Sequence, residues 1–138
     1  MGWLAAPKEV AARCWYMRDY VSLSPGKLND ALALLALAHR EQIVARNSAI
    51  IAANLEAAQA WIDDSSGMLS WQPPRGGLLA LLHYNLDLPS LTLADKLAQE
   101  YSVMLAPGSA FGYENYLRIG IGQRPEIFQA GLVAAQAC

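Results

Sequence analysis

Charged side chains are scarce in this chain of 138 residues, since Asp, Glu, Lys and Arg together make up only 16% of it. A soluble domain normally carries about 25%, so we infer that part of the surface meets another molecule. The ten basic and twelve acidic residues give a net charge of −2 and form no basic patch, and we therefore expect no nucleic-acid partner. The apolar content of 54% excludes a disordered chain.

Cysteines and long apolar runs are also few. Cys14 and Cys138 are the only cysteines, which is too few for a disulfide framework or a zinc site. The longest unbroken apolar run, residues 31–38, is eight residues long, whereas a membrane span needs about 20. The first nine residues lack the basic start and the apolar stretch of a secretory signal. We expect a cytoplasmic protein without a membrane segment or a metal site.

The first half of the chain predicts helices. A short helix is expected to end near Tyr20, and Ser24 and Pro25 are a suitable N-cap and first turn for the next one. Apolar residues then recur at helical spacing, with no Pro or Gly between Lys27 and the glycine at position 67. The pattern predicts one long helix over 27–62, about 54 Å in length at 1.5 Å per residue, with apolar residues on two faces.

The second half predicts short strands alternating with helices. Flanking turn residues and apolar content indicate three strands, at 78–82, 103–106 and 116–121. Helices are expected over 91–101, with Thr92 as N-cap, and from Pro125 onward. The fold class is therefore α+β: a long N-terminal spine helix, followed by a β-α-β-β-α layer with a small three-stranded sheet.

A chain of this length predicts a single domain, 1–138. Within it, 1–26 is a helix and loop that lead in, 27–62 is the long helix, and 71–138 is the small α/β layer.

Few groups suggest chemistry. His39 and His83 share no constellation and are interpreted as structural or surface residues. The segment that ends in Lys27 is not a phosphate-binding loop, because it lacks the earlier glycine and the Ser or Thr after the lysine.

Arg118 stands out because it lies in an otherwise apolar strand. With a period of two, it shares a face with Tyr116 and Gly120, opposite Leu117 and Ile119. Its guanidinium could bind a ligand carboxylate through two parallel hydrogen bonds. The alternative interpretation is an arginine on the solvent face of an edge strand.

Several segments, taken in order, resemble the C-terminal small domain of class I and II aminotransferases. These are pyridoxal-phosphate enzymes of fold type I, the aspartate aminotransferase fold. The matching segments are Pro-Arg-Gly-Gly at 74–77, the Pro-Gly-Ser-Ala-Phe-Gly stretch within 101–112, and Asn-Tyr-Leu-Arg-Ile-Gly-Ile-Gly at 115–122. Segments 2–9, 18–20 and the helix with His-Arg-Glu at 39–41 continue the resemblance in the family's order.

The resemblance implies roles for a few residues. Arg118 corresponds to the arginine that binds the substrate α-carboxylate, and the turn at Gly76 and Gly77 would lie near the substrate, which makes Gly77 a second substrate-binding candidate. The loop 20–24 would approach the cofactor region of a neighbouring subunit.

The resemblance also implies that this chain lacks the large cofactor-binding domain. The lysine that forms the Schiff base, and the residues that hold the cofactor phosphate and ring, belong upstream of Gly2 in the family. None of Lys8, Lys27 and Lys96 has the required context. We therefore expect a truncated chain that binds no pyridoxal phosphate alone and has no catalytic residue of its own.

The resulting interpretation is the substrate-carboxylate-binding domain of an enzyme that transfers an amino group between an amino acid and a 2-oxo acid. Two alternatives remain: a non-enzymatic module that self-associates through the helix 27–62, and one half of a split aminotransferase or amino-acid lyase. The expected partners are accordingly a second copy of the chain or a separate large-domain chain.

Overall fold

The computed structural model describes residues 2–21, 23 and 26–138 and divides the chain into two compact units, Met1–Val44 and Ala45–Cys138. The single domain over 1–138 stays a prediction. Each unit is described by itself below.

The first unit is helical. It contains α1 (Lys8–Arg18), α2 (Lys27–Ala38) and the start of α3 (Arg40–Asp63). Extended Gly26 precedes α2, whereas the predicted N-cap and first turn at Ser24 and Pro25 lie outside the described residues. Neither α1 nor α2 has a buried residue, because the unit has too few elements to enclose a core.

The predicted single helix over 27–62 is wrong, since α2 and α3 are separate helices. His39 interrupts them with φ −107° and ψ 18°, outside the helical region. Its backbone N–H still bonds to Leu35 O, and its ring Nδ1 lies 2.9 Å from that same oxygen. A side chain that competes for a helical carbonyl favours a break that apolar spacing alone does not reveal.

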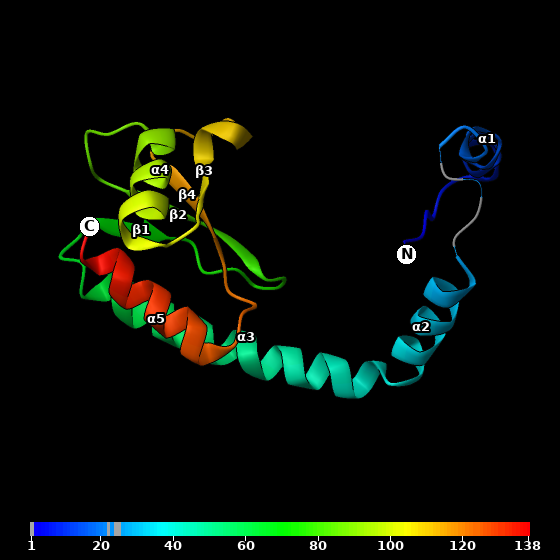
Figure 1. Cartoon of the computed structure of the whole chain (residues 1–138), viewed down its shortest axis with the longest axis horizontal. Helices are drawn as coiled ribbons and strands as arrows, with labels where there is room; N and C mark the ends of the chain where they lie inside the picture. The colour runs from blue at the N-terminus through cyan, green and yellow to red at the C-terminus, as the bar shows by residue number, and fades with distance from the viewer. Residues whose placement is uncertain (1, 22, 24–25) are drawn as a thin grey trace. The chain divides into compact units, whose positions relative to one another are not determined.

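The second unit contains most of α3, a small sheet and two further helices (Figure 1). Its elements after α3 are, in order, β1 (Leu69–Trp71), β2 (Leu79–Tyr84), α4 (Ser90–Tyr101), β3 (Ala106–Pro107), the 3₁₀ turn η1 (Gly108–Phe111), β4 (Tyr116–Gly120) and α5 (Pro125–Gln136).

The sheet is antiparallel with strand order β1-β2-β4-β3, so it has four strands rather than the predicted three. The missed strand is β1, in which Ser70 pairs with His83 of β2. The observed order after α3 is thus β-β-α-β-β-α, with η1 between β3 and β4. An α+β fold is confirmed, whereas the predicted layer order is not.

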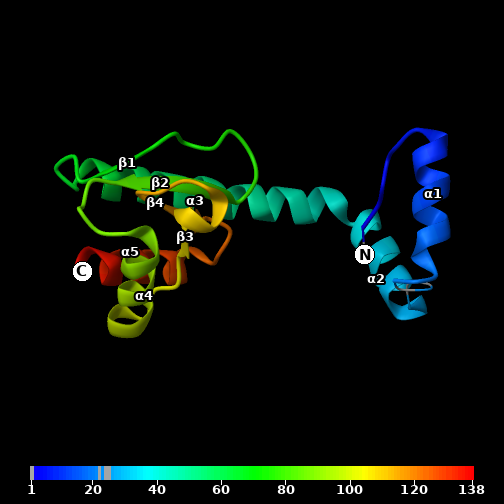
Figure 2. The same ribbon diagram turned by 90° about the horizontal axis from the view of Figure 1, so that it is seen from above.

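All three helices of this unit cover the same face of the sheet. Ala58 and Ile62 of α3 and Phe128 and Leu132 of α5 pack on the inward residues of β2 and β4. Leu93, Ala94 and Leu97 of α4 pack beside them on Tyr84 and Leu117. Figure 2 shows α4 and α5 on one side of the strands. Within the second unit, Ala45–Cys138, no helix packs on the opposite face of the sheet, and we call it the open face.

Two local predictions in this unit are wrong. Helix α4 begins at Ser90 after Pro89, not at an N-cap on Thr92. The strand predicted over 103–106 is wrong in its bounds: β3 covers only Ala106–Pro107, and Val103 N–H bonds back to Leu97 O at the end of α4 and is not free to pair in the sheet. Throughout the described part of the chain, the helices are too short or too polar to cross a membrane.

Candidate functional site

Arg118 lies on the open face of the sheet. The burial along β4 alternates strictly, so that Leu117 and Ile119 face the helices while Tyr116, Arg118 and Gly120 face away from them. This confirms the period-two prediction for the strand. Arg118 is half-buried there, because neighbouring strands flank it on both sides.

The position of β4 contradicts the alternative of an edge strand. Arg118 pairs with Leu81 of β2 on one side and with Ala106 of β3 on the other. A side chain in an interior strand is enclosed by cross-strand neighbours and has a defined direction. The arginine is therefore held within the sheet surface and does not extend freely from a margin.

The guanidinium of Arg118 stacks on an aromatic ring. Its Cζ lies 4.6 Å from the ring centroid of Phe111, the last residue of η1. Within the described residues, Arg118 makes no ion pair, whereas Arg40 and Arg124 pair with neighbouring glutamates. A half-buried cation without an anion suits an external anion, and the planar fork of arginine fits a carboxylate through two hydrogen bonds.

The turn that carries Phe111 is closely packed. A Cβ atom at Gly108 would collide with the backbone oxygens of Tyr113 and Tyr116. Ser109 N–H donates a hydrogen bond of 3.1 Å to the hydroxyl of fully buried Ser90, at the start of α4. The turn is thereby fastened to both β4 and α4.

Glu114 completes this attachment. Its carboxylate accepts a hydrogen bond from Ser90 N–H, one of the otherwise unpaired donors at the start of α4. That bond lowers the pKa of Glu114 below its ordinary value, because it stabilises the charged form. The carboxylate also lies at the positive end of the helix dipole.

Tyr84 belongs to the helix-covered face, not to the open face. Its hydroxyl donates a hydrogen bond of 2.8 Å to Leu88 O, and burial raises its pKa, with a further contribution from the charge of Glu114. We interpret it as a core residue.

Gly77, the second predicted site residue, lies in the turn before β2 with φ +79°. The turn continues alongside the end of β4, where Ile121 N–H bonds to Leu78 O at 2.8 Å. Gly77 is thus tied to the strand of Arg118, but no contact joins the two side-chain positions. Its role as a substrate contact stays a prediction.

A hollow of about 540 Å³ lies on the open face over β1 and β2. His83 forms its polar side, with Ser70 Oγ 3.4 Å from its Nδ1 and the ring of Tyr116 5.0 Å away, edge to face. Sequence reasoning assigned His83 a structural or surface role and did not find this grouping, because Ser70 belongs to the strand that was missed. His39 belongs to the other unit.

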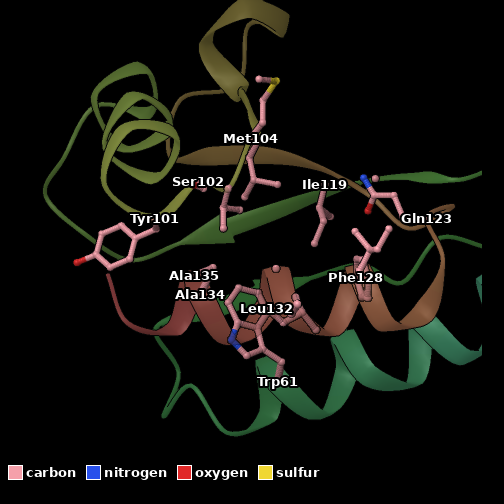
Figure 3. A pocket seen from close by; sticks show the side chains of 16 residues that line it. Trp61, Tyr101, Ser102, Met104, Ile119, Gln123, Phe128, Leu132, Ala134 and Ala135 are labelled. Carbon is pink, nitrogen blue, oxygen red and sulfur yellow. The ribbon is translucent and has the colours of Figure 1, made fainter.

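A second hollow, of about 430 Å³, lies on the helix-covered side (Figure 3). Trp61 of α3 and Leu132 of α5 form one side of it, and Ser102 and Met104 form the other. No acidic, basic or histidine side chain lines it. It therefore offers no carboxylate, imidazole or amine for acid–base chemistry, and we do not assign it a catalytic role.

The residues around Arg118 do not fit a resident pyridoxal phosphate. The only lysine of the second unit is Lys96, on α4, and α4 covers the face of the sheet opposite to Arg118. Lys8 and Lys27 belong to the first unit. Within the second unit, no lysine lies on the side of Arg118 to bond the cofactor. The described residues also hold no group of three metal-binding side chains.

Comparison with known proteins identifies a family and several similar proteins. The family model for aminotransferase class I and II matches residues 22–130. Capreomycidine synthase from Streptomyces vinaceus is 27% identical over 135 residues, which covers 97% of this chain and 34% of that protein.

Solved structures agree with this. A PLP-dependent aminotransferase from Streptococcus suis 89-1591 superposes with a TM-score of 0.90 at 32% identity, covering 98% of this chain and 36% of that one. The PLP-dependent cyclase OrfR gives a TM-score of 0.86 at 26% identity, covering 96% and 37%. The chain spans about a third of the length of each of these proteins.

Proposed function

Because this chain belongs to the class I and II aminotransferase family, we propose that its sheet unit is the part of such an enzyme that binds the substrate α-carboxylate, with Arg118 as the ligand. The observation that carries the proposal is the arginine itself: half-buried, in an interior strand, on the open face, and without an anion among the described residues. The reaction of the whole enzyme would transfer an amino group between an amino acid and a 2-oxo acid.

The role of this chain in that reaction is to bind and orient. The two N–H groups at the edge of a guanidinium hold a carboxylate in one plane, which fixes the rotation of the substrate about the bond to its α-carbon. Pyridoxal phosphate, when bound to an enzyme of this family, supplies the electron sink for the reaction. The only lysine of the sheet unit, Lys96, lies on α4 of the helix-covered side, so we expect no turnover from the chain alone.

The decisive experiment is a titration of the chain with propionate, followed by the backbone amide NMR signals of β4 (Tyr116–Gly120), which the wild type and the variants share. Arg118→Lys should weaken binding about tenfold, because a charge-assisted hydrogen bond contributes about 1.5–3 kcal/mol and a point charge does not reproduce the fork. Arg124→Lys is the matched control, since Arg124 is exposed and already paired with Glu126. Equal binding by the wild type and Arg118→Lys would remove Arg118 from the site.

The expected lack of turnover is tested separately. The chain is mixed with pyridoxal phosphate and an amino acid, and the visible absorbance is recorded with Lys8, Lys27 and Lys96 present and replaced by arginine. We expect no lysine-dependent absorbance band and no 2-oxo acid product. A lysine-dependent band with turnover would refute the proposal that the chain is inactive alone.

A second candidate function is association with another chain. Helix α2 has no buried residue, and Leu28, Leu32 and Leu35 on it are all more than half exposed. Apolar surface of this extent is typical of an interface. The partner would be a second copy of this chain or a large-domain chain of a split aminotransferase or lyase. Light scattering after size exclusion separates these cases. A dimer of the chain alone favours the first partner, and a monomer that assembles only with a lysine-bearing chain favours the second. A chain that stays monomeric alone and in the mixture contradicts association.

A further inference from the structure

The guanidinium of Arg118 lies over the ring of Phe111, with Cζ 4.6 Å from the ring centroid. Within the described residues, cation–aromatic stacking occurs at two places, Arg18 on Trp15 and Arg118 on Phe111. Only the second involves a residue of the sheet. Phe111 is 45% exposed. Burial of apolar area in the core therefore does not account for its position.

Three features hold this ring in place. Ala106 of β3 pairs with Arg118, so the chain enters the turn directly opposite the arginine. Gly112 follows the ring with φ +80°, and its N–H bonds back to Gly108 O and Ser109 O. The hydroxyl of Ser90 then accepts a bond from Ser109. The backbone position of Phe111 is therefore set by η1 and its attachments.

A guanidinium that lies flat on an aromatic ring keeps its N–H donors free. The attraction acts between the flat face of the cation and the ring, whereas the five N–H donors lie in the plane of the guanidinium and point outward from its rim. A ring on one face therefore restricts the rotation of the side chain without using a donor. The other aromatic residues of the open face cluster with one another, since Tyr116 contacts Tyr113 and His83.

We propose that Phe111 is a positioning residue that fixes the plane of the Arg118 guanidinium, so that its N–H edge is preorganised for a carboxylate. This inference rests on the proposed function of Arg118. It adds that the π face of Phe111, and not only its apolar volume, orients Arg118. Preorganisation of this kind raises affinity because less side-chain freedom is lost on binding.

The first test measures the arginine without ligand. The ¹⁵N relaxation of the Arg118 Nε–H group is recorded in the wild-type chain, in Phe111→Leu and in Phe111→Tyr. Phe111→Leu keeps the apolar bulk but removes the π face, so Arg118 should become more mobile on the picosecond to nanosecond timescale. Phe111→Tyr should keep it ordered. Tyr113→Leu is the matched control, since Tyr113 contacts Tyr116 and not the arginine. Unchanged order of Arg118 in Phe111→Leu would overturn the inference.

The second test measures propionate affinity in the same variants. Phe111→Leu should weaken binding about two- to fivefold, as expected for the loss of one partly exposed cation–aromatic contact, while Phe111→Tyr and Tyr113→Leu should bind like the wild type. The outcomes separate the two proposals. Loss of binding in Arg118→Lys with no effect of Phe111→Leu contradicts the role of Phe111 alone, whereas binding that is indifferent to Arg118→Lys contradicts the proposed function itself.

Discussion

Asn54 of α3 donates a hydrogen bond of 2.8 Å from its amide nitrogen to the carbonyl oxygen of Gln123. The same nitrogen donates a second bond, of 3.1 Å, to Ile121 O. Both acceptors lie just after β4, so one fully buried side chain ties the helix to the segment that follows the Arg118 strand. The amide is satisfied on its nitrogen side, whereas its Oδ1 is buried without a partner among the described residues.

Replacement of Asn54 should destabilise the sheet unit. Asn54→Ala removes the donor from the carbonyl oxygens of Ile121, which is buried, and Gln123, which costs about 1–3 kcal/mol. Asn54→Asp should cost more near neutral pH than near pH 4, because an ionised carboxylate would face the same carbonyl oxygens. Denaturant unfolding at the two pH values measures both effects. Asn47→Ala, on the exposed surface of α3, is the control, and a loss as large as that of Asn54→Ala would contradict this account.

Glu114 should make the unit sensitive to acid. Its folded-state pKa is lowered by the hydrogen bond from Ser90 N–H, so its contribution to stability is present above the unfolded pKa of about 4.3. That contribution is lost as the pH falls through the lowered folded-state pKa. Glu114→Gln should therefore reduce stability at neutral pH and flatten the pH dependence below about pH 5. Thermal unfolding between pH 2 and 7 tests this, with Glu100→Gln on α4 as the charge control. If the melting temperature of Glu114→Gln changed with pH in the same way as that of the wild type, the capping role would be contradicted.

The parts of the fold that could be predicted are those in which apolar residues recur at a regular spacing. The alternation in 116–121 placed Arg118 on the face opposite to Leu117, and the structure confirms it. The resemblance is also confirmed at the level of the family. Both depend on patterns that are local in the sequence.

The parts that were missed depend on distant partners. Strand β1 is only three residues long and is defined by its pairing with β2, which no local pattern reveals. The break at His39 depends on one side chain beside the Leu35 carbonyl. The stacking of Phe111 on Arg118 arises from the path of the turn between β3 and β4. The only sequence signal for it was an aromatic residue in the Pro-Gly-Ser-Ala-Phe-Gly stretch.

Two glycines should respond oppositely to alanine. At Gly108, a Cβ would collide with backbone oxygens that cannot move without opening the turn. Gly108→Ala should therefore be strongly destabilising and should mobilise Arg118. At Gly131, inside α5, a Cβ meets nothing. Gly131→Ala should stabilise the unit by about 0.5–1 kcal/mol, because glycine loses more backbone entropy in a helix. Calorimetry compares the two, and similar changes in melting temperature would contradict the packing described for Gly108.

Gly77 provides a test that separates backbone strain from contact with a substrate. Its φ of +79° is unfavourable for any residue with a Cβ, although the space around it is open. Gly77→Ala should therefore destabilise the unit by about 1–2 kcal/mol through conformation alone. Gly76, the adjacent residue, has neither a positive φ nor a close neighbour, so Gly76→Ala is the matched control and should be close to neutral. If Gly77 also contacts the substrate, Gly77→Ala should weaken propionate binding under conditions where the variant is fully folded. Normal propionate affinity in the folded variant would show that Gly77 serves only the conformation of its turn. Arg118 would then be the one carboxylate ligand that the proposal requires.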